Sequence, residues 1–428
     1  MAPPTMNMNK RTFLKQMALL GLGASPLLEY LDRLVQAVER MPDVDVAKDE
    51  TFWAKIRAGY RLKPDYINLE NGYYCMMPEE ILERYLEHVR EVNHQASYYM
   101  RTVQTDNRRL MVEMLSQVAD CSPDNLVITR NTTESLDLVI AGVHWKAGDE
   151  AVLAEQDYGA MLDMFKLQAQ RHGIVNRLVS LPNDPADDQE IVDLYAAAIT
   201  SKTRLLMICH MVNITGQILP VKKICEMAHA RDVEVMIDGA HAFAHIDSNI
   251  PALGADYYGA SLHKWLGAPL GCGILWVKPD KVATLWPLFA GSERPADDIS
   301  RLNHTGTKPV HVELAIADAL AYHARLGPTR KEARLRHLQT YWTSRVRDLP
   351  RILVNTPRDP ARSCAIANVG IEGMEPSDLA RKLLQDHKIW TVAINRPGVR
   401  GCRITPNIFT TPAELDVLIG ALRETVGA

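Results

Sequence analysis

The chain has 428 residues, of which 47% are hydrophobic and 23% charged, and its formal net charge is −4. This length predicts one large and one smaller domain, and the composition excludes extensive disorder. The near-neutral charge gives no reason to expect a nucleic-acid partner, and no apolar run reaches the ~20 residues of a membrane span. The seven cysteines form no C-x-x-C pair, which argues against a zinc ribbon or a disulfide framework.

The N-terminal 45 residues contain the segment NKRTFLKQMALLGLGAS. It resembles a twin-arginine export signal in which Lys10 replaces the first arginine, ahead of Arg11 and a short apolar stretch. No clean A-x-A cleavage motif follows, and the alternative is an amphipathic N-terminal helix. We expect a leader over residues 1–45, and we therefore favour a periplasmic over a cytoplasmic location.

The region 46–327 alternates short apolar runs with helical stretches after a first short helix in DETFWAKIRAGYRL. This pattern predicts βαβ units and a large αβα domain around a mostly parallel sheet. We expect strands in NLVITR, EAVLAEQD, TRLLMICHMV, VEVMID, ADYYGASL and CGILWV. We expect the intervening helices in TTESLDLVIAGV, YGAMLDMFKLQAQRHG, PVKKICEMAHARD and GAHAFAHI. Sheets of this kind bind ligands beyond the carboxyl ends of their strands.

A long helical region follows from about Val310, and an α+β pattern occupies the rest of the chain. We expect residues 328–428 to form the smaller C-terminal domain.

Two of the predicted strands end in groups that suit a charged ligand. NLVITR leads to Thr132 and Thr133, whose hydroxyl and backbone N–H groups at a helix start form an anion site. Simple N-capping by threonine is the alternative. VEVMID ends in Asp238, which suggests a cationic partner there, the alternative being a helix N-cap.

A third strand end carries a lysine in the stretch SLHKWLGAPLGCG. An amine buried next to glycines is the group that forms a Schiff base, and its alternative is a surface lysine in a turn. Lys264 has Ser261 and His263 beside it. A rival hypothesis is a metal site, because His241 and His245 are four residues apart, but the glutamate of the zinc motif is missing.

Together these signals are what pyridoxal 5′-phosphate (PLP) requires: an anion site, a carboxylate and a lysine. At this point the chain resembles the class V aminotransferase family of fold-type I PLP enzymes, in its isopenicillin N epimerase-like branch. The resemblance covers about Tyr66 to Thr411. Its carriers are NTTESL, EQDYGA, HMVNITGQILP, MIDGAHAF, ASLHKWLGAPLGCGIL, HTGT and CRITPNIFTT.

The resemblance implies a role for each matching residue toward the cofactor. Lys264 matches the Schiff-base lysine, Asp238 the partner of the ring nitrogen, and Tyr158 the residue stacked on the ring. The phosphate ligands are matched by Thr132, Thr133, Ser261 and His263.

Further positions match contacts to the substrate or across subunits. Asn213 and His241 match side chains near the ring hydroxyl or the substrate, and Arg403 matches the arginine that binds the substrate α-carboxylate. Thr307 matches a phosphate contact across a homodimer interface. Tyr73 is a candidate for the side-chain pocket. Four other residues there are either pocket or interface residues: Tyr74, Tyr98, Tyr99 and Arg101.

One feature departs from the desulfurases of this family, in which a mobile loop before the arginine carries a nucleophilic cysteine. In this chain the segment is AINRPGVRGCRIT, and its cysteine, Cys402, directly precedes Arg403. Neighbours in a strand point to opposite faces, so we expect Cys402 to face away from the substrate. Gly267, Gly271 and Gly273 are expected to be close-packing positions.

We therefore expect a PLP-dependent enzyme that activates the Cα bond of an amino acid or an amino-acid-like group, as an aminotransferase or an epimerase. With the leader, its substrate is expected to be an exported metabolite such as a siderophore peptide. The alternatives are a PLP-dependent C–S lyase or cysteine desulfurase, and a non-catalytic binding or regulatory protein on the same fold. We expect a small-molecule ligand, a homodimer, no metal, no nucleic acid and no stable membrane span.

Overall fold

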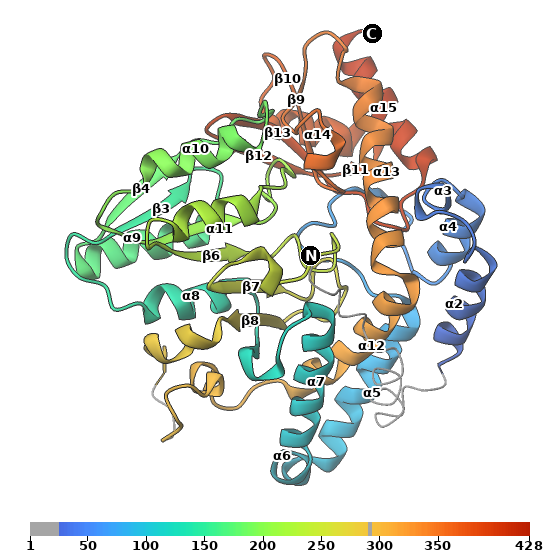
Figure 1. The fold of residues 1–428 in the computed structure, drawn as a ribbon. Helices are drawn as coiled ribbons and strands as arrows, with labels where there is room; N and C mark the ends of the chain where they lie inside the picture. The colour runs from blue at the N-terminus through green and yellow to red at the C-terminus, as the bar shows by residue number, and fades with distance from the viewer. Residues whose placement is uncertain (1–24, 290–292) are drawn as a thin grey trace.

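The structure is a computed structural model that describes residues 25–289 and 293–428 (Figure 1). Its centre is a seven-stranded sheet in which β8 runs antiparallel to both of its neighbours and the other paired strands are parallel. The predicted large domain with a mostly parallel sheet is thereby confirmed. In spatial order the strands are β2 (Leu126–Thr129), β8 (Gly273–Val277), β7 (Tyr257–Ser261), β6 (Glu234–Asp238), β5 (Thr203–Cys209), β3 (Glu150–Ala154) and β4 (Val175–Val179).

Helices cover both faces of this sheet, which explains why its central strands are apolar throughout. Successive residues of a strand point to opposite faces. Leu205 and Met207 of β5 pack in one core, whereas Leu206 and Ile208 pack in the other. The first core is completed by α8 (Thr132–Gly142) and α9 (Gly159–His172). The second is completed by α7 (Gln104–Ala119), α10 (Asp188–Ala198), α11 (Val221–His229) and α12 (Val310–Leu326).

The N-terminal helices pack on the second core. α2 buries Leu28, Leu31 and Leu34 there and contacts α12. The predicted leader region thus ends in a helix that belongs to the folded body, while residues 9–24 of the twin-arginine-like segment lie outside the described residues. The helices before α7 are α2 (Pro26–Ala37), α3 (Asp43–Val46), α4 (Glu50–Arg57), α5 (Glu79–Gln95) and α6 (Ser97–Thr102).

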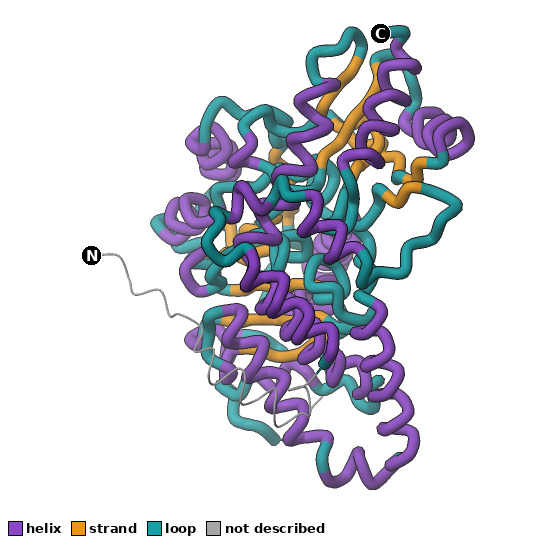
Figure 2. Tube along the Cα trace, turned by 90° about the vertical axis from the view of Figure 1, so that its right-hand side faces the viewer, coloured by secondary structure: helices purple, strands orange, loops and turns teal. Residues whose placement is uncertain are grey.

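The C-terminal domain has its own core around a four-stranded antiparallel sheet, and Figure 2 shows the strands of the two domains as separate groups. The short strand β1 (Ile67–Asn68) pairs in parallel with β11, and Leu69 is buried in this core. An N-terminal segment therefore joins the C-terminal domain. The other elements of the C-terminal domain are α13 (Pro328–Val346), β9 (Ile352–Val354), β10 (Ala367–Ile371), α14 (Pro376–His387), β11 (Ile389–Trp390), β12 (Val392–Arg396), β13 (Val399–Ile404) and α15 (Pro412–Val426).

One expected helix is absent: residues 239–246 form successive turns. The N–H of Ala242 donates to the carbonyl of Gly239 at 3.0 Å, and the N–H of His245 donates to that of Ala242 at 3.0 Å. Ala244 has a φ of +57°, in the left-handed region, which interrupts a right-handed helix. Within the described ranges, no helix is long and apolar enough to cross a membrane.

Candidate active site

A cavity of about 250 Å³ lies at the carboxyl ends of β5, β6 and β7, where the C-terminal domain meets the large sheet. The fold brings most of the predicted residues to its wall, although they come from distant parts of the sequence. The predicted residues that line it are Tyr73, Thr132, Thr133, Tyr158, Asn213, Asp238, His241, Ser261, His263, Lys264 and Arg403. Of the five candidates for a side-chain pocket, Tyr73 is the one on this wall.

Lys264 lies in the turn after β7 and points toward His241, whose Nε2 is 3.1 Å from the lysine Nζ. Burial lowers the pKa of this lysine to about 8, with Asp238 opposing the shift and Arg403 adding to it. A substantial fraction of the amine is therefore neutral near physiological pH. A neutral amine is the form that attacks a carbonyl carbon.

Asp238 is the last residue of β6 and is 5% exposed. Its Oδ1 accepts a hydrogen bond from the N–H of Ala240 at 2.9 Å. Desolvation raises the pKa of this carboxyl group, and the nearby Lys264 opposes that shift. A buried carboxylate in this position is stabilised by a cationic N–H donor, which is what a protonated pyridine ring presents.

The beginning of α8 carries the groups from which an anion site was predicted. The N-cap is Asn131, whose side chain accepts from the N–H of Glu134 at 2.9 Å, so the threonines are free of that task. The hydroxyls of Thr132 and Ser261 are 2.7 Å apart, and the N–H of Thr132 donates to Ser261 Oγ at 2.9 Å. Two hydroxyls at a helix N-terminus suit a phosphate group.

Two buried polar atoms on the wall have no hydrogen-bond partner among the described residues: Asn213 Oδ1 and His263 Nδ1. Burial and the neighbouring Lys264 lower the pKa of His263 to about 4, so its imidazole is neutral. Unpartnered buried polar atoms are rare in proteins, which indicates that a polar ligand completes the site. Together with Asp238 and the start of α8, they fit PLP.

Arg403 reaches the cavity from β13, and its main partner was not predicted from the sequence. Glu70 accepts from Arg403 Nη2 at 2.5 Å and from Nε at 3.1 Å, and both side chains are buried. Nη1 donates to the carbonyl of Asn213 at 3.2 Å. Glu70 thus fixes the plane of the guanidinium by one edge. Because 333 residues separate the pair, no local pattern could have revealed it.

The structure confirms that Cys402 faces away from the cavity. Its side chain is fully buried in the core of the C-terminal domain, with Sγ 3.6 Å from the carbonyl of Pro376. The segment before Cys402 is a tight hairpin: Arg396 pairs with Val399 across a two-residue turn. A mobile cysteine-bearing loop is therefore absent from residues 392–404.

Several wall residues were not predicted. Cys209, at the end of β5, is buried beside Asp157 and Asp238, and its thiol pKa is raised by burial and by these carboxylates. Asp157 itself has a pKa raised to about 7, chiefly by burial. Arg130 lies on the wall and pairs with Glu134 at 3.2 Å. The alternation of strands and helices predicts polar residues at these strand ends. It does not predict a thiol beside two carboxylates.

The two histidines of the rival metal hypothesis do not converge. His245 Nδ1 contacts the carbonyl of His241 at 2.8 Å, and its Nε2 accepts from the N–H of Ala365 at 3.0 Å. Both ring nitrogens of His245 are therefore occupied, and its ring stacks on Trp265. Among the described residues, no three His, Cys, Asp or Glu side chains are grouped to hold a metal ion.

Thr307 and three glycines are the remaining residues for which the sequence predicted a role. Thr307 lies outside the lining of its own chain's cavity, so its role across a dimer interface stays a prediction. Gly273 is a close-packing position, since a Cβ there would be 2.7 Å from the carbonyl oxygen of Ala260. For Gly267 and Gly271 that expectation is wrong, because their surroundings are open and they are required by φ values of +74° and +93°.

Known proteins resemble the chain over most of its length. Residues 74–398 match the Aminotransferase class-V family. An isopenicillin N epimerase of Streptomyces clavuligerus is 30% identical over 395 residues, 88% of this chain and 98% of that protein. A probable cysteine desulfurase of Mycolicibacterium paratuberculosis is 25% identical over 86% of this chain and 58% of its own length.

Among solved structures, a variant of the protein C-DES with glycine covalently linked to its PLP cofactor has a TM-score of 0.76. It is 19% identical, and the match covers 84% of this chain and 96% of that one. This likeness confirms the fold, and the family match covers the strand ends described above. The chain therefore belongs to the aminotransferase class V family and is a PLP-dependent enzyme of fold type I.

Proposed function

We propose that the enzyme activates the Cα–H bond of an amino acid or an amino-acid-like group, as an aminotransferase or an epimerase. The observation that carries this proposal is the Lys264 amine, on one cavity wall with Asp238, His241 and Arg403, while Cys402 of the hairpin 392–404 faces away. When bound, PLP supplies an electron sink for the negative charge that develops at Cα.

Each residue then has a task that follows from its surroundings. With PLP bound, the lowered pKa of Lys264 would allow its amine to accept a proton from Cα and to return it to the substrate. Asp238 stabilises positive charge at the far end of the ring. Arg403, held by Glu70 through Nε and Nη2, presents its remaining N–H groups to a carboxylate.

The relatives support this proposal but divide on the reaction. The isopenicillin N epimerase is similar over nearly its whole length, which favours chemistry at Cα. The twin-arginine-like segment adds an argument about the substrate, because an exported enzyme meets exported metabolites. We therefore propose an amino-acid group carried on a larger molecule, such as a siderophore peptide.

The test is a screen of free amino acids and short peptides with the purified holoenzyme. It follows the visible absorbance of the cofactor and identifies products by mass spectrometry and chiral chromatography. Ketone products support transamination, and inverted Cα configuration or deuterium incorporation from D₂O supports epimerisation. A holoenzyme that exchanges no Cα hydrogen with any member of the screen would favour the non-catalytic alternative.

Cysteine desulfuration is the second candidate, because a probable desulfurase is among the relatives and Cys209 lines the cavity. The raised pKa of Cys209 and its fixed place at a strand end oppose a nucleophilic role. We expect no persulfide from L-cysteine, and we expect C402S to retain native turnover. Persulfide formation that disappears in C402S or in Cys209→Ser would establish the desulfurase instead.

We further propose that the protein is a homodimer exported by its twin-arginine-like segment. Thr307 lies outside its own cavity, and the resemblance pairs this position with a second subunit. Light scattering of the holoenzyme tests the dimer. Export is tested by fractionating cells that express either the unchanged full chain or its double variant K10A/R11A. We expect the unchanged chain in the periplasm and the double variant to be absent from it.

A further inference from the structure

His241 lies between two nitrogen atoms that contact its two ring nitrogens. Trp265 Nε1 donates to His241 Nδ1 at 3.3 Å, and Lys264 Nζ is 3.1 Å from His241 Nε2. An indole N–H is a donor only, so the nitrogen that faces it must be an acceptor. In a neutral imidazole, when one ring nitrogen accepts, the other carries the hydrogen.

We propose that Trp265 is a positioning residue that holds His241 in its Nε2–H tautomer, so that His241 donates a hydrogen bond toward the Lys264 amine. This donor favours a lysine nitrogen that has a free lone pair over an ammonium, which has none. Trp265 thus acts on the lysine through His241 and touches no reacting atom itself.

The charges around the pair agree with a neutral imidazole. Burial lowers the pKa of His241 well below its usual value, and nearby positive charge lowers it further. An indole N–H directed at Nδ1 also opposes a second proton on the ring. The titratable groups that face Lys264 or His241 are Asp238, Arg403, His245, His263, Cys209 and Cys75.

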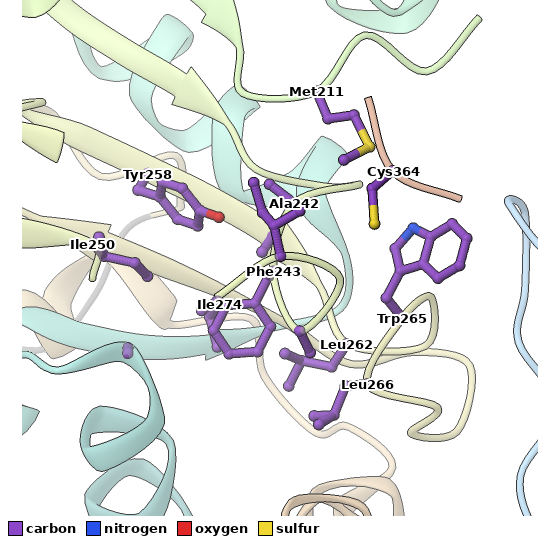
Figure 3. Packing of buried hydrophobic residues seen from close by; sticks show 14 of the residues in the cluster. Met211, Ala242, Phe243, Ile250, Tyr258, Leu262, Trp265, Leu266, Ile274 and Cys364 are labelled. Atoms are coloured by element: carbon purple, nitrogen blue, oxygen red, sulfur yellow. The ribbon is translucent and has the colours of Figure 1, made fainter. Parts of the chain in front are cut away.

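Trp265 is held both through its ring and through its backbone. Trp265 is 2% exposed and stacks on His245, with ring centroids 3.7 Å apart and planes inclined by 23°. Lys331 of α13 donates to the carbonyl of Trp265. Figure 3 shows Trp265 among the buried side chains of the main core, which also includes Cys364 of the C-terminal domain. The ring of Trp265 is therefore packed against His245, while its backbone is bonded to α13 of the C-terminal domain.

The tautomer can be measured in the apoprotein, without any turnover. Long-range ¹H–¹⁵N correlation of ¹⁵N-histidine-labelled protein distinguishes Nε2–H from Nδ1–H, and H241Q identifies the signals of this residue. We expect the Nε2–H tautomer in wild type. In Trp265→Phe, which keeps the stacked ring but removes the donor, we expect a mixture or the Nδ1–H tautomer.

A matched control is Trp53→Phe. Trp53 is equally buried and donates its indole N–H to the carbonyl of Val46 at 2.8 Å, remote from His241. It should leave the His241 signals unchanged. If W265F does not fold, the wild-type spectrum alone decides, because an Nδ1–H or doubly protonated His241 in that spectrum overturns the proposal.

The consequence for the lysine is a second readout. PLP condenses with the neutral amine and releases water, so the pH midpoint of its incorporation rate into apoprotein reports the pKa of Lys264. We expect W265F to raise this midpoint by about one unit, since a hydrogen bond to a charged group is worth about tenfold or more. H241Q removes the imidazole that connects Trp265 to Lys264. Adding W265F to H241Q should therefore cause no further shift of the pH midpoint.

An unchanged midpoint in W265F, or an equal shift in W53F, would overturn the proposal. Its functional meaning rests on the proposed role of Lys264, but the two fail separately. If Lys264 is not the reacting lysine, no variant shows the visible absorbance of bound PLP at that residue. If only the role of Trp265 is wrong, the absorbance forms normally, and W265F leaves the tautomer of His241 or the pH midpoint of PLP incorporation unchanged.

Discussion

The two halves of the site are built differently. The cofactor half comes from consecutive strand ends of one sheet, where Cys209 of β5 pairs in register with Asp238 of β6, and β7 leads directly to Lys264. The proposed substrate half is Arg403 on a hairpin of the other domain, held by Glu70 from a segment 333 residues away. Hydrogen bonds between strands fix the first half, whereas the second depends on how two domains meet.

This difference predicts that changes in the cofactor half abolish chemistry, whereas changes in the substrate half weaken binding and leave the cofactor in place. Substitutions at Lys264, Asp238 and Arg403 test this division.

The largest effect is expected for Lys264→Ala, which removes the amine that the sheet places in the cavity. The variant should fold, as judged by circular dichroism, but lose the visible absorbance of bound PLP and all turnover. Lys331 is the matched comparison, since burial also lowers its pKa to about 8 although it lies outside this cavity. Borohydride reduction and peptide mapping should place the cofactor on Lys264, and a label on Lys331 would contradict the assignment.

Asp238→Asn should lower turnover by several orders of magnitude while PLP still binds. The substitution keeps the shape of the side chain but removes the charge that stabilises a protonated ring, and each ~1.4 kcal/mol of barrier is a factor of ten in rate. Single-turnover kinetics with the substrate found in the screen measures the effect. If the rate is unchanged, Asp238 serves only to accept the N–H of Ala240.

Arg403→Ala should leave the PLP absorbance intact and lower kcat/KM by about 10- to 100-fold, because a charge-assisted hydrogen bond is worth about 1.5–3 kcal/mol. The control is Arg400→Ala on the same strand, whose side chain is 54% exposed and pairs with Glu375. Steady-state kinetics should show no change there. Loss of PLP in R403A would mean that the two halves are not independent.

Asp157→Asn is expected to leave the division between the two halves unchanged and to alter the pH dependence of stability. Burial raises the folded-state pKa of Asp157 to about 7, whereas the unfolded carboxyl titrates near ~3.9. The folded state therefore holds a proton that the unfolded state releases, and the free energy of unfolding of wild type should fall as pH rises from 4 to 7. Urea titrations at several pH values should show a weaker fall in D157N, with the exposed Asp163→Asn as control.

The sequence indicated the cofactor half because each signal there is local. Each pattern can be recognised within a few residues of sequence: an apolar strand followed by Asp238, a strand followed by Ser261 and Lys264, and a helix start at Thr132. Parallel strands bring their carboxyl ends to one edge, so the residues had to meet once the sheet was inferred. Cys402 was placed correctly for the same reason, since alternation in a strand is a local rule.

The predictions that were wrong concern backbone conformation, which the residue types at these positions do not reveal. GAHAFAHI has the composition of a helix, but Ala244 takes a left-handed φ, so His241 and His245 are held by turns and not by helical spacing. Gly267 and Gly271 were misjudged because open space and positive φ cannot be read from a glycine in a sequence.

Strand period and strand ends are local properties of the chain, so the sheet, the family and most residues of the wall could be predicted from the sequence alone. Only the tertiary structure decided that Glu70 holds Arg403, that Trp265 donates to His241, and that Leu69 lies in the core of the C-terminal domain. These contacts join residues that are far apart in sequence or set by a turn geometry. Their energies depend on burial and direction, which exist only once both domains have packed.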